Sequence, residues 1–343
     1  MSWRYGEWRA AHALPIGVLT RAGEGSEVRA GDIIAHGTTY GTPQRVAAAR
    51  RLGIAAADLP RVMRVSSGAE VERGTIIART GRRFARAVSA PIDGRIAHVR
   101  ADGDLEIAPV VDRWTVRSTL DGRVTRSDEG TIVVEGAAWG LQAVAAYGPD
   151  ATGDLALAVD GAGDELQPTR VDVRLRGRII VGGARGAAEA ITRAHACGVG
   201  AVVAGAVPAG GLRVVFGEDV SARGRSTRAD APTVLCLLGF GAAPLPAAIF
   251  GPLAAFAGAR AAVHTASARL FVFAAPDAVR AETALPSLAL APDWGSVRVL
   301  EGPAVLSAET RFASEITGPA VATPDGAVPA ANVRSLAATP IAD

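Results

Sequence analysis

The chain has 343 residues, of which 49% are apolar and 20% charged, so it can bury the cores of two or three domains. Its 36 basic residues oppose 34 acidic ones, and this balance gives no whole-protein argument for a nucleic-acid or membrane partner. Every basic residue is arginine. The absence of lysine excludes a Schiff-base lysine, a phosphate-loop lysine, and covalently attached biotin or lipoate.

The cellular compartment is indicated by three features. The two cysteines, Cys197 and Cys236, lie in apolar surroundings without CxxC spacing, which argues against a disulfide framework or a zinc site made of cysteines. The first fifteen residues lack the apolar core of a signal peptide, so we expect a cytoplasmic protein. Residues 231–259 carry no charge, but prolines and glycines divide them into a strand, a turn and a helix, and we expect no membrane span.

A short phrase occurs twice, as GSEVRAGDIIAHG at 25–37 and GAEVERGTIIART at 68–80. In each copy valine and an isoleucine pair flank a glycine, which predicts a hairpin. We expect the two hairpins to pack face to face about a pseudo-twofold axis, because one hairpin alone is marginally stable in water. Between them, Thr42 as a cap, Pro43 in the first turn and Gly53 at the end predict a helix.

A second repeat follows the first. APIDGRIAHVRADGDLEI at 90–107 is echoed by STLDGRVTRSDEGTIVV at 118–134, and both stretches predict hairpins. Residues 1–150 are therefore predicted to form a β-rich region with a helical insertion near 42–53.

The order of these phrases resembles the barrel-sandwich hybrid fold of biotinyl and lipoyl domains, which also occurs in RNA polymerase large subunits and membrane-fusion adaptors. The resemblance covers roughly residues 15–135 and implies this fold for the β-rich region. It rests on Gly68, Val71, Gly74, Ile77, Ala78, Val88, Ala90, Pro91, Asp93, Gly94 and Ile96. In carrier domains the turn between the two phrases presents the modified lysine. Here Arg82 and Arg83 stand near that place, so a carrier function is not supported.

The same turn, RTGRRFARA, is our candidate for binding a partner. Its arginines, which no acidic residue interrupts, are Arg79, Arg82, Arg83 and Arg86. Arginine at the tip of a hairpin can bind phosphate or carboxylate through paired hydrogen bonds. The alternative is a solvated charged turn, and the single aromatic residue, Phe84, is too little for a base-stacking platform.

After Pro149, predicted strands alternate with predicted helices. Residues 171–183 read as a strand, followed by a helix that ends at Gly198 and a buried strand, VGAVVAGAV. A second unit follows, with a strand at 233–241, a helix, and strands near 261–263 and in RLFVFAA. This alternation predicts a parallel sheet with both faces covered, in an α/β domain over 151–285.

Several glycines stand where these strands end. In open parallel sheets ligands bind beyond the carboxyl ends of strands, where glycine permits close approach and helix N-termini attract anions. VGGARGAAEA is not a GxGxxG motif, however, and the glycines could simply make tight turns. The candidates for binding a small anion are Gly182, Gly183, Arg185, Gly205, Gly239 and Gly241.

The histidines do not form a recognisable motif in the sequence. His195 lies near a predicted helix end and is expected to be buried or capping, and the other four, His12, His36, His98 and His264, are scattered singly. No GxSxG, HExxH or paired-acid motif occurs, so we expect no metal site and no cofactor, and nothing argues for an enzyme.

The last part of the chain, 286–343, predicts short strands separated by turns. VRVLEGP resembles the start of the KOW motif in SH3-like barrels of ribosomal proteins and transcription factors, and VPAANVRSL resembles their closing strand. The sequence departs from the motif after Pro303, which puts nucleic-acid binding in doubt. As a whole, the chain resembles a family of bacterial proteins of unassigned function that combines these three parts.

The expected fold is therefore an α+β multi-domain protein: a barrel-sandwich hybrid, a central α/β domain and a small SH3-like barrel. We favour a non-catalytic interaction or scaffold protein whose β modules bind a partner protein or nucleic acid. The alternative is an α/β domain that binds a small anionic ligand such as phosphate or a nucleotide, or acts as an enzyme, with docking modules on its flanks. The first is favoured because the predicted ligand cleft contains glycine but no evident acid, base or nucleophile.

Overall fold

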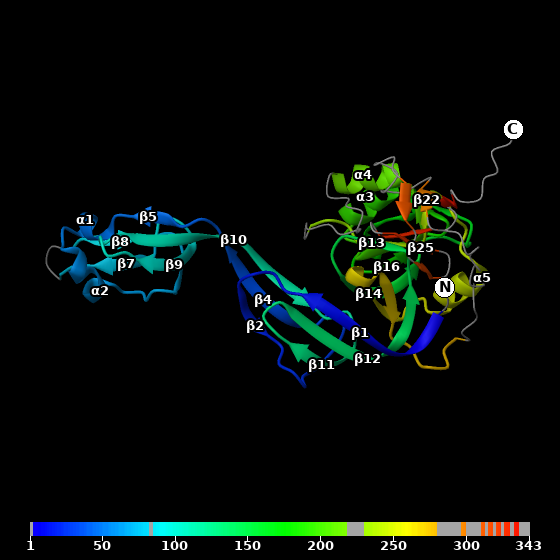
Figure 1. Cartoon of the computed structure of the whole chain (residues 1–343), viewed down its shortest axis with the longest axis horizontal. Coiled ribbons are helices and arrows are strands. Elements are labelled where there is room, and N and C mark those ends of the chain that lie inside the picture. The colour runs from blue at the N-terminus through cyan, green and yellow to red at the C-terminus, as the bar shows by residue number, and fades with distance from the viewer. Residues whose placement is uncertain are drawn as a thin grey trace.

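The protein is described by a computed structural model over residues 3–81, 85–217 and 230–279, together with the backbone of six short strands between 296 and 335. It is a mixed α+β protein made mostly of strands, with a large mixed sheet that contains parallel strands and a separate antiparallel sheet. Figure 1 shows an α/β lobe from which a β-rich arm extends, and we divide this arm into a proximal and a distal module.

The α/β lobe is built on four parallel strands in the order β19, β18, β16, β14. Both faces of β18 are buried, since Val202 and Ala204 contact one apolar cluster and Ala201 and Val203 the other. This is why the central strands are apolar throughout. The bounds are Ala151–Leu157 for β14, Ile179–Val181 for β16, Ala201–Val207 for β18 and Val234–Phe240 for β19.

Helices cover the two faces of this sheet. Residues of α3 (Ala188–Ala196) and α4 (Ala209–Phe216) pack in one cluster, and those of α5 (Ala247–Ala255) in the other. The predicted end of α3 is confirmed, because the chain turns at Gly198 with φ +76°. Among the described residues, no helix is long and apolar enough to cross a membrane.

The predicted all-parallel sheet is corrected in two respects. β20 (Arg260–His264) lies antiparallel to β14, and β21 (Arg269–Val272) continues the sheet to β12, so the sheet is mixed. The strand predicted over 171–183 is limited to β16. Its first part forms the 3-10 helix η3 (Val173–Leu175), which begins where the Asp172 side chain accepts the Arg174 N–H. Shorter elements of the lobe are β13 (Ala145–Tyr147), β15 (Glu165–Leu166), η2 (Pro168–Arg170), β17 (Arg185–Gly186) and η5 (Thr265–Ser267).

Cys236 provides a chemical test of this buried sheet. Its side chain in β19 is fully buried, and burial raises the pKa of the thiol to about 12. We expect iodoacetamide at pH 8 to leave Cys236 unmodified in the native protein and to label it after unfolding, as measured by peptide mass spectrometry. Since the folded pKa is raised, this thiol also lowers stability as the pH rises above about 8.5, its value in an unfolded chain. Labelling of Cys236 as fast as that of the half-buried Cys197 would contradict this burial.

The proximal module comprises residues 10–40 and 110–135. It has its own apolar cluster, which includes Ile34, Trp114 and Val134. Two long paired strands run from it into the α/β lobe, so the two parts share one sheet. The strands of this module are β1 (Trp3–Ala13), β2 (Val18–Arg21), β3 (Glu27–Val28), β4 (Ile33–Tyr40), β10 (Leu105–Arg117), β11 (Gly122–Ser127) and β12 (Thr131–Gln142).

The distal module, residues 41–109, is inserted between β4 and β10 of the proximal module. Those two strands pair from Tyr40 with Val110 to Ile33 with Arg117 and form the stem of the arm. The distal module has a separate apolar cluster that includes Leu59, Ile77 and Leu105. Its elements are β5 (Gln44–Val46), α1 (Ala48–Leu52), η1 (Ala56–Asp58), α2 (Leu59–Val62), β6 (Glu70–Val71), β7 (Ile76–Arg79), β8 (Ala87–Ser89) and β9 (Gly94–Val99).

The two modules contain the same local structure. In the proximal one, Val28 pairs with Gly122, and the Asp121 carboxylate accepts the N–H of Ala30 at 2.7 Å. The distal counterparts are the pairing of β6 with β9, through Val71 and Gly94, and the 2.7 Å hydrogen bond from the Arg73 N–H to the Asp93 carboxylate. The hairpins predicted for the second repeat are confirmed as β9 with β10 and β11 with β12.

The predicted pairing of the first repeat is wrong. Neither copy is a hairpin, because β3 pairs with β11 while β4 pairs with β2 and β10. In the distal copy, β6 pairs with β9 and β7 with β8. Gly31 and Gly74, with φ of +97° and +90°, turn the chain at a corner instead. Each copy therefore packs against the second repeat within its own module, and the two copies do not face each other.

The predicted helix over 42–53 is shorter than expected. The C-terminal end at Gly53 is confirmed, with φ +69°, but α1 begins only at Ala48, without a side-chain cap. Residues Gln44–Val46 instead pair with β10, because a free strand edge there takes precedence over local helix propensity.

The described backbone of the last part of the chain forms two three-stranded antiparallel sheets, β23-β22-β27 and β24-β25-β26. Their bounds are Ser296–Val299 for β22, Thr310–Phe312 for β23, Glu315–Thr317 for β24, Ala320–Thr323 for β25, Gly326–Pro329 for β26 and Val333–Ser335 for β27.

Candidate functional site

The predicted ligand glycines lie at the carboxyl edge of the parallel strands, where the chain's own backbone approaches them. A Cβ at Gly183, where φ is +66°, would overlap the carbonyl oxygen of Asp164, and one at Gly205 would overlap that of Ala243. At Gly182 a Cβ would stand 3.2 Å from the Leu166 side chain. The close approach that these glycines allow is therefore used by neighbouring loops.

The backbone donors at this edge are also paired. The N–H of Gly182 donates to Val203 at 2.7 Å, and that of Gly205 donates to Gly183 at 2.7 Å. The N–H of Gly241, where φ is +93°, donates to Val207 at 3.1 Å, and Gly239 lies two residues earlier, within β19, with φ +131°. An anion would have to displace these bonds to bind through the same groups.

Arg185 lies at the same edge but is bound within the chain. Its Nη1 is 3.2 Å from the Glu165 carboxylate, and both side chains are partly exposed. Binding of an anion by Arg185 and the glycines stays a prediction.

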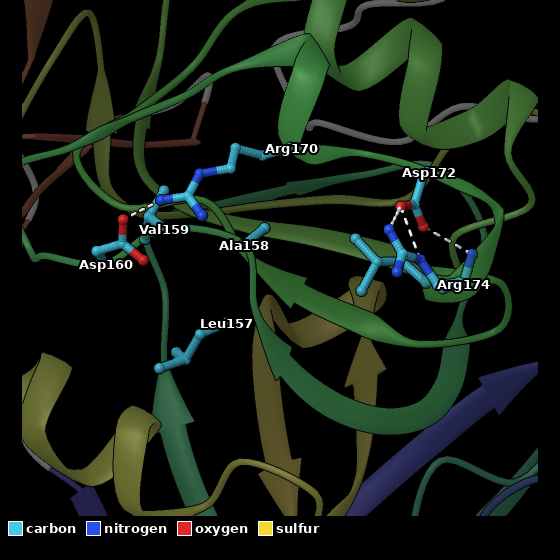
Figure 2. A pocket seen from close by; sticks show the side chains of 8 residues that line it. Leu157, Ala158, Val159, Asp160, Arg170, Asp172 and Arg174 are labelled. Atoms are coloured by element: carbon cyan, nitrogen blue, oxygen red, sulfur yellow. Dashed lines mark hydrogen bonds and ion pairs between the residues drawn. The ribbon is translucent and has the colours of Figure 1, made fainter.

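A pocket of about 210 Å³ lies beside this edge, where β14 ends (Figure 2). It is smaller than the roughly 300–1,000 Å³ of most small-molecule sites. Two arginines face it, and each forms an ion pair with a lining carboxylate: Arg170 with Asp160, and Arg174 with Asp172. The hydrogen bond from the Arg174 side chain, with that from its N–H, holds the pKa of Asp172 below its usual value. The positive charge of the pocket is thus largely neutralised from within.

The arginine turn lies in the distal module, at the β7–β8 hairpin. Arg79 and Arg86 flank the turn and are exposed, and the Thr80 N–H closes it by donating to the Arg86 carbonyl at 2.9 Å. Arg82 and Arg83 lie outside the described residues. Within the described part of the chain, neither Arg79 nor Arg86 forms an ion pair.

The acidic residues that could have neutralised this turn have other partners. Asp102 pairs with Arg45 at 3.3 Å and with Arg100 at 3.4 Å. Glu106 pairs with Arg100 at 2.8 Å, and Asp104 lies 3.9 Å from Arg45. The arginines that flank the turn therefore keep their charge available to a partner.

Charge is unevenly distributed between the distal module and the rest of the chain. Residues 41–109 contain twelve arginines and seven acidic residues, a net charge of +5. Since the whole chain carries +2, the remainder carries −3. The near-neutral total therefore conceals a positive module, a property that the whole-chain count could not reveal.

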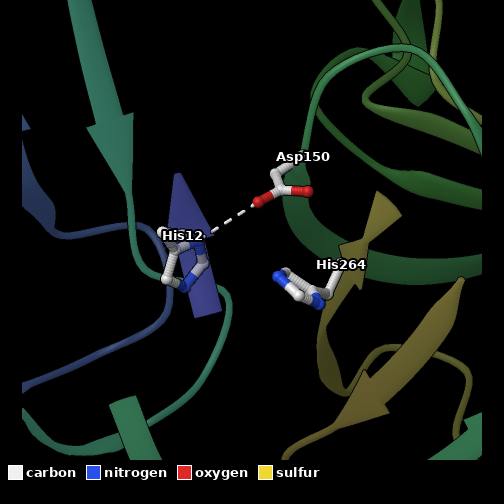
Figure 3. Close-up of side chains that lie close together, drawn as sticks. All are labelled: His12, Asp150 and His264. Carbon is white, nitrogen blue, oxygen red and sulfur yellow. Dashed lines mark hydrogen bonds and ion pairs between the residues drawn. The ribbon is translucent and has the colours of Figure 1, made fainter. Parts of the chain in front are cut away.

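A buried cluster of His12, Asp150 and His264 was not expected from the sequence (Figure 3). His12 Nδ1 lies 3.2 Å from Asp150 Oδ2, and the two imidazole rings meet edge to face with centroids 5.1 Å apart. The members stand more than a hundred residues apart and follow no motif spacing, so no local signal could have identified them. Of the other histidines, His36 and His98 are exposed, as is His195, which was expected to be buried or capping.

The environment of this cluster controls its ionisation. Burial lowers the pKa of His264, although the nearby Asp150 charge opposes this shift. Burial by itself would raise the pKa of Asp150, but the hydrogen bond from His12, the charges of both histidines and the Thr265 N–H outweigh it and hold that pKa below its usual value. A neutral His264 imidazole beside an ionised carboxylate is the state expected at neutral pH.

The comparisons with known proteins add no further constraint: no protein-family model, curated protein or solved structure matches the chain.

Proposed function

We propose that the protein is a non-catalytic adaptor whose distal module binds an anionic partner, either an acidic protein surface or a nucleic acid. The observation that carries the proposal is the charge of the arginine turn, where Arg79 and Arg86 are exposed and form no ion pair within the described residues. The net charge of +5 on residues 41–109 supports it, since a local positive field attracts anionic partners. The position of the module at the far end of the arm makes it accessible (Figure 1).

A finer description of the fold belongs to the same proposal. We propose that each β module is a barrel-sandwich hybrid and that the distal one is inserted into the proximal one. The matched corners at Ala30 and Arg73 support this assignment. We also propose an SH3-like barrel over 286–343, because its first described strand, β22, pairs with its last, β27.

The proposal is tested by replacing Arg79 and Arg86 together with alanine. The probes are labelled duplex DNA, duplex RNA and a Glu-rich peptide, and affinity is measured by fluorescence anisotropy at several salt concentrations. We expect the variant to bind its preferred probe at least tenfold more weakly, because Arg–phosphate and Arg–carboxylate hydrogen bonds are lost. If the probe is duplex DNA, the slope of log affinity against log salt should fall by about 1.8 for two phosphate contacts. The free energy of unfolding should change by less than about 0.5 kcal/mol.

The matched control replaces Arg123 and Arg126 with alanine, which also removes two positive charges but lies outside the distal module and the pocket beside β14. These arginines form exposed ion pairs with Glu27 and Asp128, which are worth at most about 1 kcal/mol each. Equal weakening by both double variants would show that only net charge matters. If none of the probes binds the wild-type protein, the anionic-partner proposal fails.

A second candidate function is the binding of a small anion at the carboxyl edge of β14. It is favoured by one observation, the 210 Å³ pocket that Arg170 and Arg174 face. Titration with inorganic phosphate and with nucleotides, followed by calorimetry, separates it from the adaptor function. Saturable binding that is lost on Arg170→Ala would support the small-ligand function, whereas the distal-module variant would leave such binding unchanged.

A further inference from the structure

The buried cluster joins three segments of the chain. His12 is in β1 of the proximal module, Asp150 precedes β14, and His264 ends β20 of the α/β lobe (Figure 3). Both histidines are only 3% exposed, and one donor atom from each of the three residues lies within 4.8 Å of the others. The Asp150 side chain is 27% exposed, so the cluster can be reached from solvent on one side.

The outer atom of each side chain is held by a hydroxyl or an N–H group. Asp150 Oδ1 accepts the N–H and the Oγ1 hydroxyl of Thr265, both at 2.8 Å. His264 Nδ1 lies 2.7 Å from Ser267 Oγ, and His12 Nε2 lies 3.5 Å from Thr119 Oγ1. Such partners fix ring orientation and tautomer in metal sites.

The remaining donor atoms point toward one another. His12 Nδ1 faces Asp150 Oδ2. Because Nδ1 of His264 contacts Ser267, we take its Nε2 as the third donor, and Figure 3 shows one nitrogen of the His264 ring directed at the other two residues. In the absence of metal, His264 Nε2 lies 3.2 Å from the Ala11 carbonyl oxygen, and a metal ion would replace this contact. Two imidazole nitrogens and one carboxylate oxygen form a three-ligand donor set that suits Zn²⁺.

Distances are also compatible with a metal ion. Tetrahedral ligands about 2.0–2.1 Å from zinc lie roughly 3.3 Å apart, and His12 Nδ1 and Asp150 Oδ2 are separated by 3.2 Å. The His264 nitrogen lies at most 4.8 Å from the other two donor atoms. It must therefore move toward them by about 1.5 Å at most to reach the tetrahedral spacing, and side-chain rotation can supply this movement.

We propose that His12, Asp150 and His264 bind Zn²⁺ and that the ion fastens the proximal module to the α/β lobe. The site is independent of the distal module, so the proposal goes beyond the adaptor function and does not depend on it. Without metal, the four ring nitrogens retain their hydrogen-bond partners, and the competing account is a metal-free polar network.

The first experiment measures zinc in full-length protein purified without a polyhistidine tag. After incubation with zinc and dialysis, inductively coupled plasma mass spectrometry should find one zinc ion per chain. Asp150→Asn and His264→Gln should lose it, whereas the controls Asp172→Asn and His98→Gln should keep it. EDTA should lower the Tm of the wild-type protein, and added zinc should restore it. If the protein retains no zinc, and neither EDTA nor added zinc changes its Tm, the proposal is overturned in favour of the metal-free network.

A substitution outside the three ligands keeps the proposal testable if the ligand variants do not fold. Ser267→Ala keeps all three donor side chains and removes only the partner of His264 Nδ1. We expect its zinc affinity to fall about 10- to 100-fold, measured by competition with a chelator of known affinity. If the cluster is a metal-free network, Ser267→Ala will lower the Tm by the same amount with and without zinc.

Discussion

Replacing Gly183 with alanine is expected to destabilise the protein by about 2–5 kcal/mol, the sum of a left-handed backbone penalty and an overpacking penalty. The residue has φ +66°, and a Cβ would overlap the Asp164 carbonyl oxygen. Backbone cannot move aside as a flexible side chain can, so the loop that contains Asp164 must shift. The Ala184 N–H donates to that same carbonyl at 2.7 Å, and this bond would be strained as well. Urea unfolding followed by circular dichroism measures the effect.

Gly177→Ala is the matched control. Gly177 has a similar φ of +71° in the same lobe, but nothing lies within 4 Å of its would-be Cβ. Its substitution should therefore cost only the backbone term, about 1–2 kcal/mol. Equal losses for the two variants would mean that the Asp164 loop does not fill the space over Gly183. That outcome would reopen this edge of the sheet to an anionic ligand.

Excision of the distal module is expected to abolish binding of the anionic partner while leaving the rest of the protein folded. Residues 41–109 would be replaced by an Asn-Gly turn, which suits a two-residue hairpin connection between Tyr40 and Val110. These residues are already paired across the stem, and the clusters of the two modules are separate. The shortened chain loses a net charge of +5 and retains −3, so the anionic probe should be repelled rather than bound.

Near-UV circular dichroism and a cooperative thermal transition would verify that the shortened chain is folded. Persistent binding of the same probe would place the partner site outside residues 41–109 and refute the adaptor proposal in its present form. A chain that no longer folds would show that the proximal module needs the distal one, contrary to the separation of their cores. Expression of residues 41–109 alone would then show whether partner binding belongs to that module.

Local sequence patterns correctly predicted those elements whose boundaries are set by residues nearby in the sequence. The turn at Gly198 that follows α3 and the second-repeat hairpins follow from glycine conformations and alternating apolar residues. The repeat also predicted that a local structure occurs twice, and the matched corners at Ala30 and Arg73 agree with this. Pairing partners were not predictable in this way, because β3 and β11 are joined by hydrogen bonds across almost a hundred residues of chain.

The candidate sites show the same contrast between features that local sequence predicts and features that depend on distant residues. The arginine turn was visible because four arginines fall within eight residues without an acidic residue among them. Its charge state in the fold was not visible, because only the structure shows that Arg45 and Arg100 pair with Asp102 and Glu106. The His12 cluster was invisible because its members come from three separate strands or loops, and only the fold brings them together. The glycines at the edge of the sheet were recognised from the sequence. The sequence did not show that the loops containing Asp164 and Ala243 lie against Gly183 and Gly205.

The insertion of one module inside the other favours one order of folding. The paired stem residues Tyr40 and Val110 are separated by the 69 residues of 41–109, and closing so long a loop costs about 3 kcal/mol more in entropy than closing a two-residue turn. If the distal module folds first, its own closed structure holds Gly41 beside Pro109, since the Gly41 N–H donates to the Pro109 carbonyl at 2.8 Å. The proximal strands then meet as neighbours rather than as distant segments. We therefore expect the distal module to form before the module that encloses it, so that the arm assembles from its tip toward its base.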